Sequence, residues 1–103
     1  MRAQSVTVSG VAASDALLLN PNSVGPYASI LLDMGAGCTA TVQVTLDDPA
    51  DAGAVWVSAP VAALVGATTD LVASLGVAAR AVRLNQTVGA PASTMKVLSP
   101  GIV

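Results

Sequence analysis

The stretch that decides the fold is residues 39–47, which read TATVQVTLD. Every second position is apolar and the positions between are polar; the apolar set is Ala40, Val42, Val44 and Leu46. Successive side chains of a β-strand point to opposite faces of a sheet, so this alternation places the apolar set on one face. The stretch therefore predicts a half-buried strand whose apolar side chains point into a core.

Shorter runs on both sides of this stretch repeat the alternation, at residues 5–9, 81–88 and 94–98. The side chains that these runs send inward are Val6, Val8, Val82, Leu84, Met95 and Val97. Two further runs, residues 27–32 and 54–58, are more continuously apolar. Such runs are typical of strands that are covered on both faces or that lie at a subunit contact.

Clusters of Gly, Pro, Asn and Asp separate the runs and mark turns. Short strands with frequent turns predict a single all-β domain over residues 1–103, a jelly-roll-like antiparallel β-sandwich of about seven or eight strands. We expect residues 10–26 to form a long surface connection, with a brief extended stretch at residues 16–19. For residues 69–75 two alternatives stay open: a short helix with Thr69 as its N-cap, or a loop that leads into a strand.

Charge is scarce along the whole chain. Four Lys and Arg and six Asp make ten charged residues among 103, whereas an average globular composition would supply about 26. The surface is therefore expected to be nearly neutral. The net charge of −2 and the isoelectric point of about 4.4 argue against nucleic acid as a partner, because binding phosphates takes a basic patch.

The residue types that carry most enzyme chemistry are missing. The chain has no His, no Glu and one Cys, and without a histidine nothing obvious activates the thiol of Cys38. Asp47, Asp48 and Asp51 could suggest a calcium loop. An Asp-Asp-Pro sequence after a strong strand instead favours a turn in which carboxylates accept backbone N–H groups. The sequence thus predicts a protein that is not an enzyme, with no catalytic residue, no cofactor and no metal.

A mean hydropathy of +0.72 raises the question of membrane insertion. The longest uncharged run, residues 52–69, contains Pro60 together with several Gly, Ser and Thr residues, whereas a spanning helix needs about 20 mostly apolar residues. Residues 1–10 lack the apolar block of a signal peptide. We therefore expect a chain that is made in the cytoplasm and has no membrane partner.

The aromatic and basic residues supply the candidates for a partner interface. Trp56 stands between two valines, which favours a position at the centre of the core. Tyr27 fits either the core or an exposed anchor. Arg80 and Arg83 would point to opposite faces of a strand unless Arg80 precedes the strand or a bulge intervenes. They could clamp a carboxylate of a partner or pair with the chain's own aspartates. Tyr27, Arg80 and Arg83 are the candidate partner-interface residues.

Four stretches of the sequence resemble a known family. They are residues 38–49 (CTATVQVTLDDP), 54–56 (AVW), 80–87 (RAVRLNQT) and 95–101 (MKVLSPG). Together they resemble small β proteins of tailed bacteriophages, the capsid cement or decoration proteins. The resemblance covers residues 38–101 and includes no catalytic signature.

What the resemblance implies is a structural virion protein. It would be a jelly-roll-like domain, synthesised in the cytoplasm of the host bacterium, that binds the outside of the phage head as a homodimer and ties neighbouring major capsid protein subunits together. Two alternatives stay open: a tail or neck component of the same virion, and a carbohydrate-binding β-sandwich for host attachment. Against the second, two aromatic residues are few for a sugar-binding platform.

Overall fold

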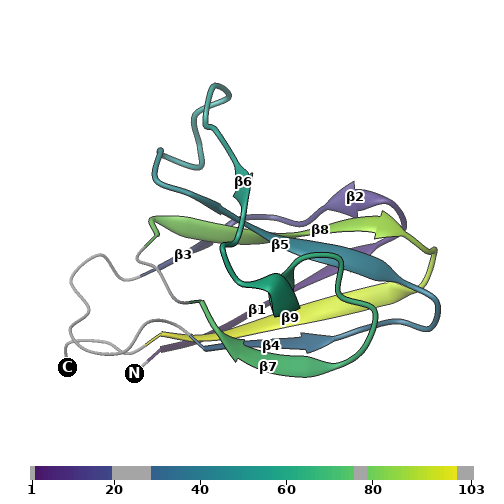
Figure 1. Cartoon of the computed structure of the whole chain (residues 1–103). Coiled ribbons are helices and arrows are strands. Elements are labelled where there is room, and N and C mark those ends of the chain that lie inside the picture. Colours follow the sequence, from purple (N-terminus) through teal and green to yellow (C-terminus); the bar gives the residue numbers. More distant parts are fainter. Residues whose placement is uncertain (1, 20–28, 76–78, 100–103) are drawn as a thin grey trace.

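Two β-sheets face each other in a computed structural model of the chain, which describes residues 2–19, 29–75 and 79–99 (Figure 1). The described elements are β1 (Arg2–Ser9), β2 (Ala12–Ala13), β3 (Leu17–Leu18), β4 (Ser29–Asp33), β5 (Thr39–Thr45), β6 (Val57–Ser58), the short 3₁₀ helix η1 (Ala62–Leu64), β7 (Leu71–Ser74), β8 (Ala81–Val88) and β9 (Ala92–Ser99). Within these residues no helix is long and apolar enough to cross a lipid bilayer.

The order of the strands is that of a jelly roll. One sheet runs β1-β9-β4-β7 and the other β2-β8-β5-β6, with β3 also pairing with β8, and every pairing is antiparallel. The first strand of the chain pairs with the last, and the other pairs follow in order toward the middle of the chain: β1 with β9, β2 with β8, β4 with β7, and β5 with β6. This is the double-sheet arrangement of a long hairpin that has been rolled up. The predicted fold class is confirmed, with two-residue strands adding to the expected number.

The core lies between the two sheets and takes side chains from both. Its fully buried members include Ile30, Leu32, Val42, Leu84, Met95 and Val97. The alternating runs of the sequence supply most of them, so the strands predicted at residues 39–47, 81–88 and 94–98 are confirmed with their inward faces. At residues 5–9, Val8 is buried and Val6 is partly buried against the core.

One predicted core residue is outside the core. Leu46 is 74% exposed, because β5 ends at Thr45 and the alternation ends with it. The side chain of Thr45 is buried directly after the buried Val44, and its Oγ1 accepts a hydrogen bond from the Asp47 N–H at 3.1 Å. A hydroxyl that bonds the backbone two residues further on competes with the strand ladder and turns the chain.

For three stretches the sequence left two interpretations open. Residues 69–75 contain β7 rather than a helix, since Leu71 and Ala73 are partly buried while Val72 and Ser74 are exposed and the run pairs with β4. The runs at 27–32 and 54–58 are not covered on both faces within the described residues: β4 alternates, and both residues of β6 are exposed.

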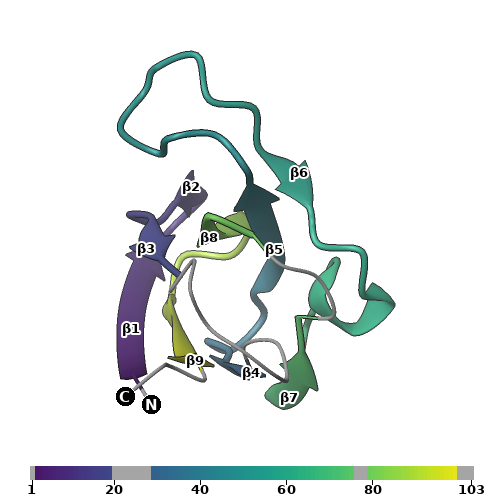
Figure 2. The same cartoon turned by 90° about the vertical axis from the view of Figure 1, so that its left-hand side faces the viewer.

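The connection predicted at residues 10–26 is described as far as residue 19. It contains β2 and β3, and β3 confirms the extended stretch expected at residues 16–19. Both strands lie beside β8, on the side of the sandwich where β1 forms the edge of the other sheet (Figure 2). Gln4 Nε2 of β1 donates to the carbonyl oxygen of Leu18 at 2.7 Å, which ties that edge to the second sheet.

Candidate functional site

The three candidate interface residues from the sequence do not come together as one described site. Tyr27 lies outside the described residues. Arg80 stands just before β8 and is exposed, and its backbone N–H donates to the carbonyl oxygen of Thr45 at 2.9 Å. Arg83 lies within β8 and is half-buried. Because Val82 and Leu84 beside it point into the core, Arg83 faces outward from the β2-β8-β5-β6 sheet.

Arg83 is part of a small cluster on that outer face. Its Nε donates to Oε1 of Gln43, the residue opposite it on β5, at 2.7 Å. Its guanidinium carbon lies 4.4 Å from the centroid of the Trp56 ring, which is cation–π geometry. The described partners of Arg83 are therefore an amide and an aromatic ring, not the aspartate that the ion-pair alternative required.

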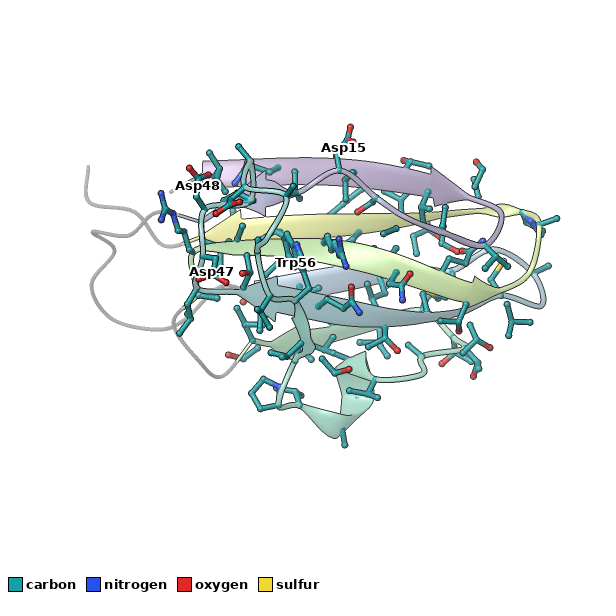
Figure 3. The ribbon with its side chains drawn as sticks, turned by 90° about the horizontal axis from the view of Figure 1, so that it is seen from above. Asp15, Asp47, Asp48 and Trp56 are labelled. Atoms are coloured by element: carbon teal, nitrogen blue, oxygen red, sulfur yellow. The ribbon has the colours of Figure 1, made fainter. Side chains whose placement is uncertain are left out.

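The prediction for Trp56 is wrong. Trp56 is half-exposed and is not a member of the buried core cluster; it lies over the outer face of the second sheet (Figure 3). The physical reason is the alternation along the chain. Val57 is opposite Val44 in the ladder and shares its side of the sheet, so the preceding residue points to the other side, where Arg83 stands.

The acidic residues after β5 hold turns, as the sequence indicated. Asp48 Oδ1 accepts the N–H of Ala50 at 3.0 Å, and Asp51 Oδ1 accepts the N–H of Gly53 at 2.9 Å. Asp47 Oδ2 reaches further along the chain and accepts the N–H of Val55 at 2.8 Å. Among the residues that the structure describes, no three His, Cys, Asp or Glu side chains form a group that could hold a metal ion.

The surface carries two apolar patches of exposed aliphatic side chains. The first lies on the outer face of the β1-β9-β4-β7 sheet. We call it the sheet patch: Leu31, Val72 and Leu98. They border a shallow hollow of about 440 Å³ that Lys96 also lines. Leu31 faces Val72 across the β4–β7 ladder and Lys96 across the β4–β9 ladder, so the only lysine of the chain stands within this patch.

The second patch lies where the chain leaves β5 and returns to β6. We call it the arm patch: Leu46, Val55 and Val57, which are 74%, 65% and 54% exposed. These side chains border a hollow of about 240 Å³ together with Val44, Thr45 and Asp47. The sequence indicates part of this patch, because residues 54–58 are more continuously apolar than a one-sided strand. It does not indicate the exposure of Leu46, which the alternation of residues 39–47 places in the core.

A polar cluster closes the opposite end of the sandwich. Gln86 is fully buried, and its Nε2 lies 3.1 Å from the carbonyl oxygens of Gly10 and Gly89 and 2.9 Å from that of Pro91. The buried thiol of Cys38 is 3.4 Å from the same Pro91 oxygen. These contacts join the turns before β2, before β5 and between β8 and β9, so the cluster is structural.

Comparison with known proteins adds no assignment: no family model matches the chain, and neither a curated protein sequence nor a solved structure matches it. The features that bear on function are therefore those of the chain itself, namely a charge-poor sandwich with two exposed aliphatic patches.

Proposed function

We propose that the protein is a structural component of a virus particle, a capsid cement protein that binds the outside of a tailed-phage head and holds neighbouring major capsid protein subunits together. The observation that carries the proposal is the pair of exposed aliphatic patches on a sandwich with little charge. Ten charged residues on 5327 Å² of accessible surface amount to about one per 530 Å². Contiguous apolar surface on a small domain marks sites of association.

A cementing role suits this surface energetically. A specific protein contact buries about 800 Å² on each partner, which is a modest share of the 5327 Å² exposed here. Small aliphatic and hydroxyl side chains lose little rotamer freedom when a contact forms. A surface with few charges also carries a small desolvation cost. Repeated copies on a shell then add weak contacts through avidity.

The resemblance to capsid cement proteins supports the same role and adds a homodimer as the binding unit. The fold is compatible with it, since jelly rolls are common among virion and sugar-binding domains, but a fold by itself does not specify a function. The major capsid protein and a second copy of this chain are accordingly the proposed partners, and the exterior of the virion is the proposed location.

The experiment is a binding assay with assembled and unassembled shell protein. Purified protein is mixed with heads that lack it and, separately, with free major capsid protein, and bound protein is measured by co-sedimentation. We expect saturable binding to heads and none to the free subunits, because a cement protein spans subunit boundaries. Binding to neither would overturn the proposal.

One observation favours a second candidate, a carbohydrate-binding module for host attachment. The only tryptophan of the chain is half-exposed, as sugar-binding platforms are. Its contact with Arg83 occupies part of the ring surface, which weakens this candidate. A glycan array separates the two: a hit that is lost in Trp56→Ala would favour sugar binding, and an empty array would favour the shell.

A further inference from the structure

The segment that connects β5 to β6 projects from the sandwich. We call residues 46–56 the arm; in both ribbon views it extends away from the two sheets (Figures 1 and 2). The arm carries most of the arm patch, with Val57 of β6 at its base. A projecting element with exposed aliphatic side chains presents apolar surface to a neighbouring molecule.

Hydrogen bonds within the arm hold its shape. Besides the three carboxylate contacts, the Asp51 N–H donates to the Asp48 carbonyl oxygen at 2.9 Å and the Ala54 N–H donates to the Asp51 carbonyl oxygen at 3.0 Å. The bond from the Val55 N–H to Asp47 Oδ2 joins the outgoing leg to the returning leg. An element already held in one shape loses less conformational entropy when it binds.

Trp56 braces the returning leg against the sheet. Its ring faces Arg83, and Arg83 is itself fixed by Gln43. Neighbouring residues of an extended chain point in opposite directions, so a tryptophan turned onto the sheet directs Val55 and Val57 the other way. The tryptophan thus positions the arm patch.

The charge of the arm identifies the kind of partner that it fits. Asp47, Asp48 and Asp51 are all exposed, and the arm itself contains no Lys or Arg. Two basic residues stand at its base, where the Arg80 N–H bonds the Thr45 carbonyl oxygen and Arg83 lies against Trp56. In the hydrogen bonds that the described residues form, each carboxylate uses one oxygen, so the second can accept from a partner. In Figure 3, Asp47 and Asp48 lie toward one end of the molecule, apart from Asp15.

A second copy of the chain does not fit this element. A two-fold axis through the arm would make the arm patch meet itself and would bring two sets of aspartates together. The sheet patch of a second copy borders Lys96 but also Asp33 and Asp70, so it offers no net positive charge to the aspartates of the arm. The arm therefore favours a different protein, one that offers an apolar groove bordered by Lys or Arg.

From these observations we infer that the arm is the element that docks on the shell. Leu46, Val55 and Val57 seat in an apolar groove of the major capsid protein, and the aspartates meet basic residues at the rim of that groove. The inference rests on the proposed function and adds to it the face that binds and the chemistry of the partner surface.

The test compares two valines of nearly equal exposure in the full chain. Val55→Asp places a charge in the arm patch, where the side chain is 65% exposed, and Val72→Asp places one in the sheet patch, where it is 68% exposed. Both variants should fold, because neither side chain is in the core. In co-sedimentation with heads that lack the protein, we expect Val55→Asp to bind about tenfold more weakly or worse, and Val72→Asp to bind within about twofold of the unchanged protein.

A second pair of variants tests the charge without disturbing the fold. Asp48→Asn and Asp51→Asn, combined, keep the side-chain oxygens that accept the turn N–H groups and remove two charges. We expect this double variant to bind heads more weakly at low salt and to show a smaller loss of binding as salt is raised. Asp15→Asn is the matched control and should bind as the unchanged protein does.

The outcomes separate the inference from the proposed function. If the unchanged protein does not bind heads, the proposed function fails. If it binds and the arm variants bind equally well, the arm inference fails and the proposed function stands. Loss of binding in Val72→Asp alone would assign the sheet patch to the shell. Loss of self-association in Val55→Asp, measured by analytical ultracentrifugation, would make the arm an interface between copies and overturn the choice of partner.

Discussion

Replacing Gln86 with leucine should destabilise the protein although leucine suits a buried position. Gln86 is fully buried, and the two hydrogens of its amide nitrogen are shared among three carbonyl oxygens, those of Gly10, Gly89 and Pro91. A leucine of similar volume gives these carbonyls no donor, and only the thiol of Cys38, a weak donor, stays 3.4 Å from the Pro91 oxygen. The turn before β2 and the turn between β8 and β9 then lose the side chain that joins them.

The magnitude follows from two opposing contributions. Each buried acceptor left without a donor costs about 1–3 kcal/mol, and the carbonyls here lie at the low end because they are only partly buried. Against this, Gln86 Oε1 is buried with no partner among the described residues, and its removal returns about 1 kcal/mol. The free energy of unfolding should therefore fall by about 2 kcal/mol, which for a domain of this size lowers the Tm by about 8–16 °C.

The assay is thermal and urea unfolding followed by circular dichroism. Asn85→Ala, at the preceding position of β8 and facing outward, is the control and should stay within about 0.5 kcal/mol of the unchanged protein. In Gln86→Glu the introduced carboxylate would face the three carbonyls, so its pKa in the folded state should rise above the ordinary value of a glutamate. Stability should then recover as the pH falls, because the folded state binds the proton more tightly. If Gln86→Leu unfolded at the same temperature as the unchanged protein, the joining role of the amide would be refuted.

Two further predictions concern packing. Leu84→Ala should lower the free energy of unfolding by about 3 kcal/mol, because the side chain is fully buried; Val72→Ala, measured in the same urea titration, should change it by less than about 0.5 kcal/mol. Gly89→Ala should cost more than Gly37→Ala, since both have a positive φ but only at Gly89 would the new Cβ lie 2.6 Å from the Cys38 Sγ. The double variant with Cys38→Ala should recover part of that excess, and additive losses in thermal unfolding would contradict this steric explanation.

The sequence predicted the sandwich because the physics of a half-buried strand is local. Alternation at residues 81–88 needs only the pleat of the strand to send Val82 and Leu84 inward, and both are fully buried. At Leu46 the same rule failed. The strand ends one residue earlier because the hydroxyl of Thr45 accepts a hydrogen bond from the Asp47 N–H in the turn that follows. An alternating pattern does not indicate where the hydrogen-bonded ladder stops.

The candidate site was harder to predict than the fold because its residues are brought together by the turn of the arm. The side of the sheet on which Trp56 lies depends on which residue of the returning leg pairs with β5, and the sequence does not specify that register. Its neighbour Arg83 is 27 positions away along the chain. The count of charged residues predicts a nearly neutral surface without any knowledge of the fold. The apolar run at residues 54–58 is the one part of the arm patch that the sequence indicates as a possible subunit contact.

Whether the protein cements a shell can be measured by heating heads with and without it. Heads assembled without the protein are divided, one portion is saturated with the purified chain, and the temperature at which each portion opens is followed by light scattering and electron microscopy. The saturated heads should open at a higher temperature, because opening must also break the contacts between the protein and neighbouring subunits. Equal opening temperatures at full occupancy would contradict the cementing role.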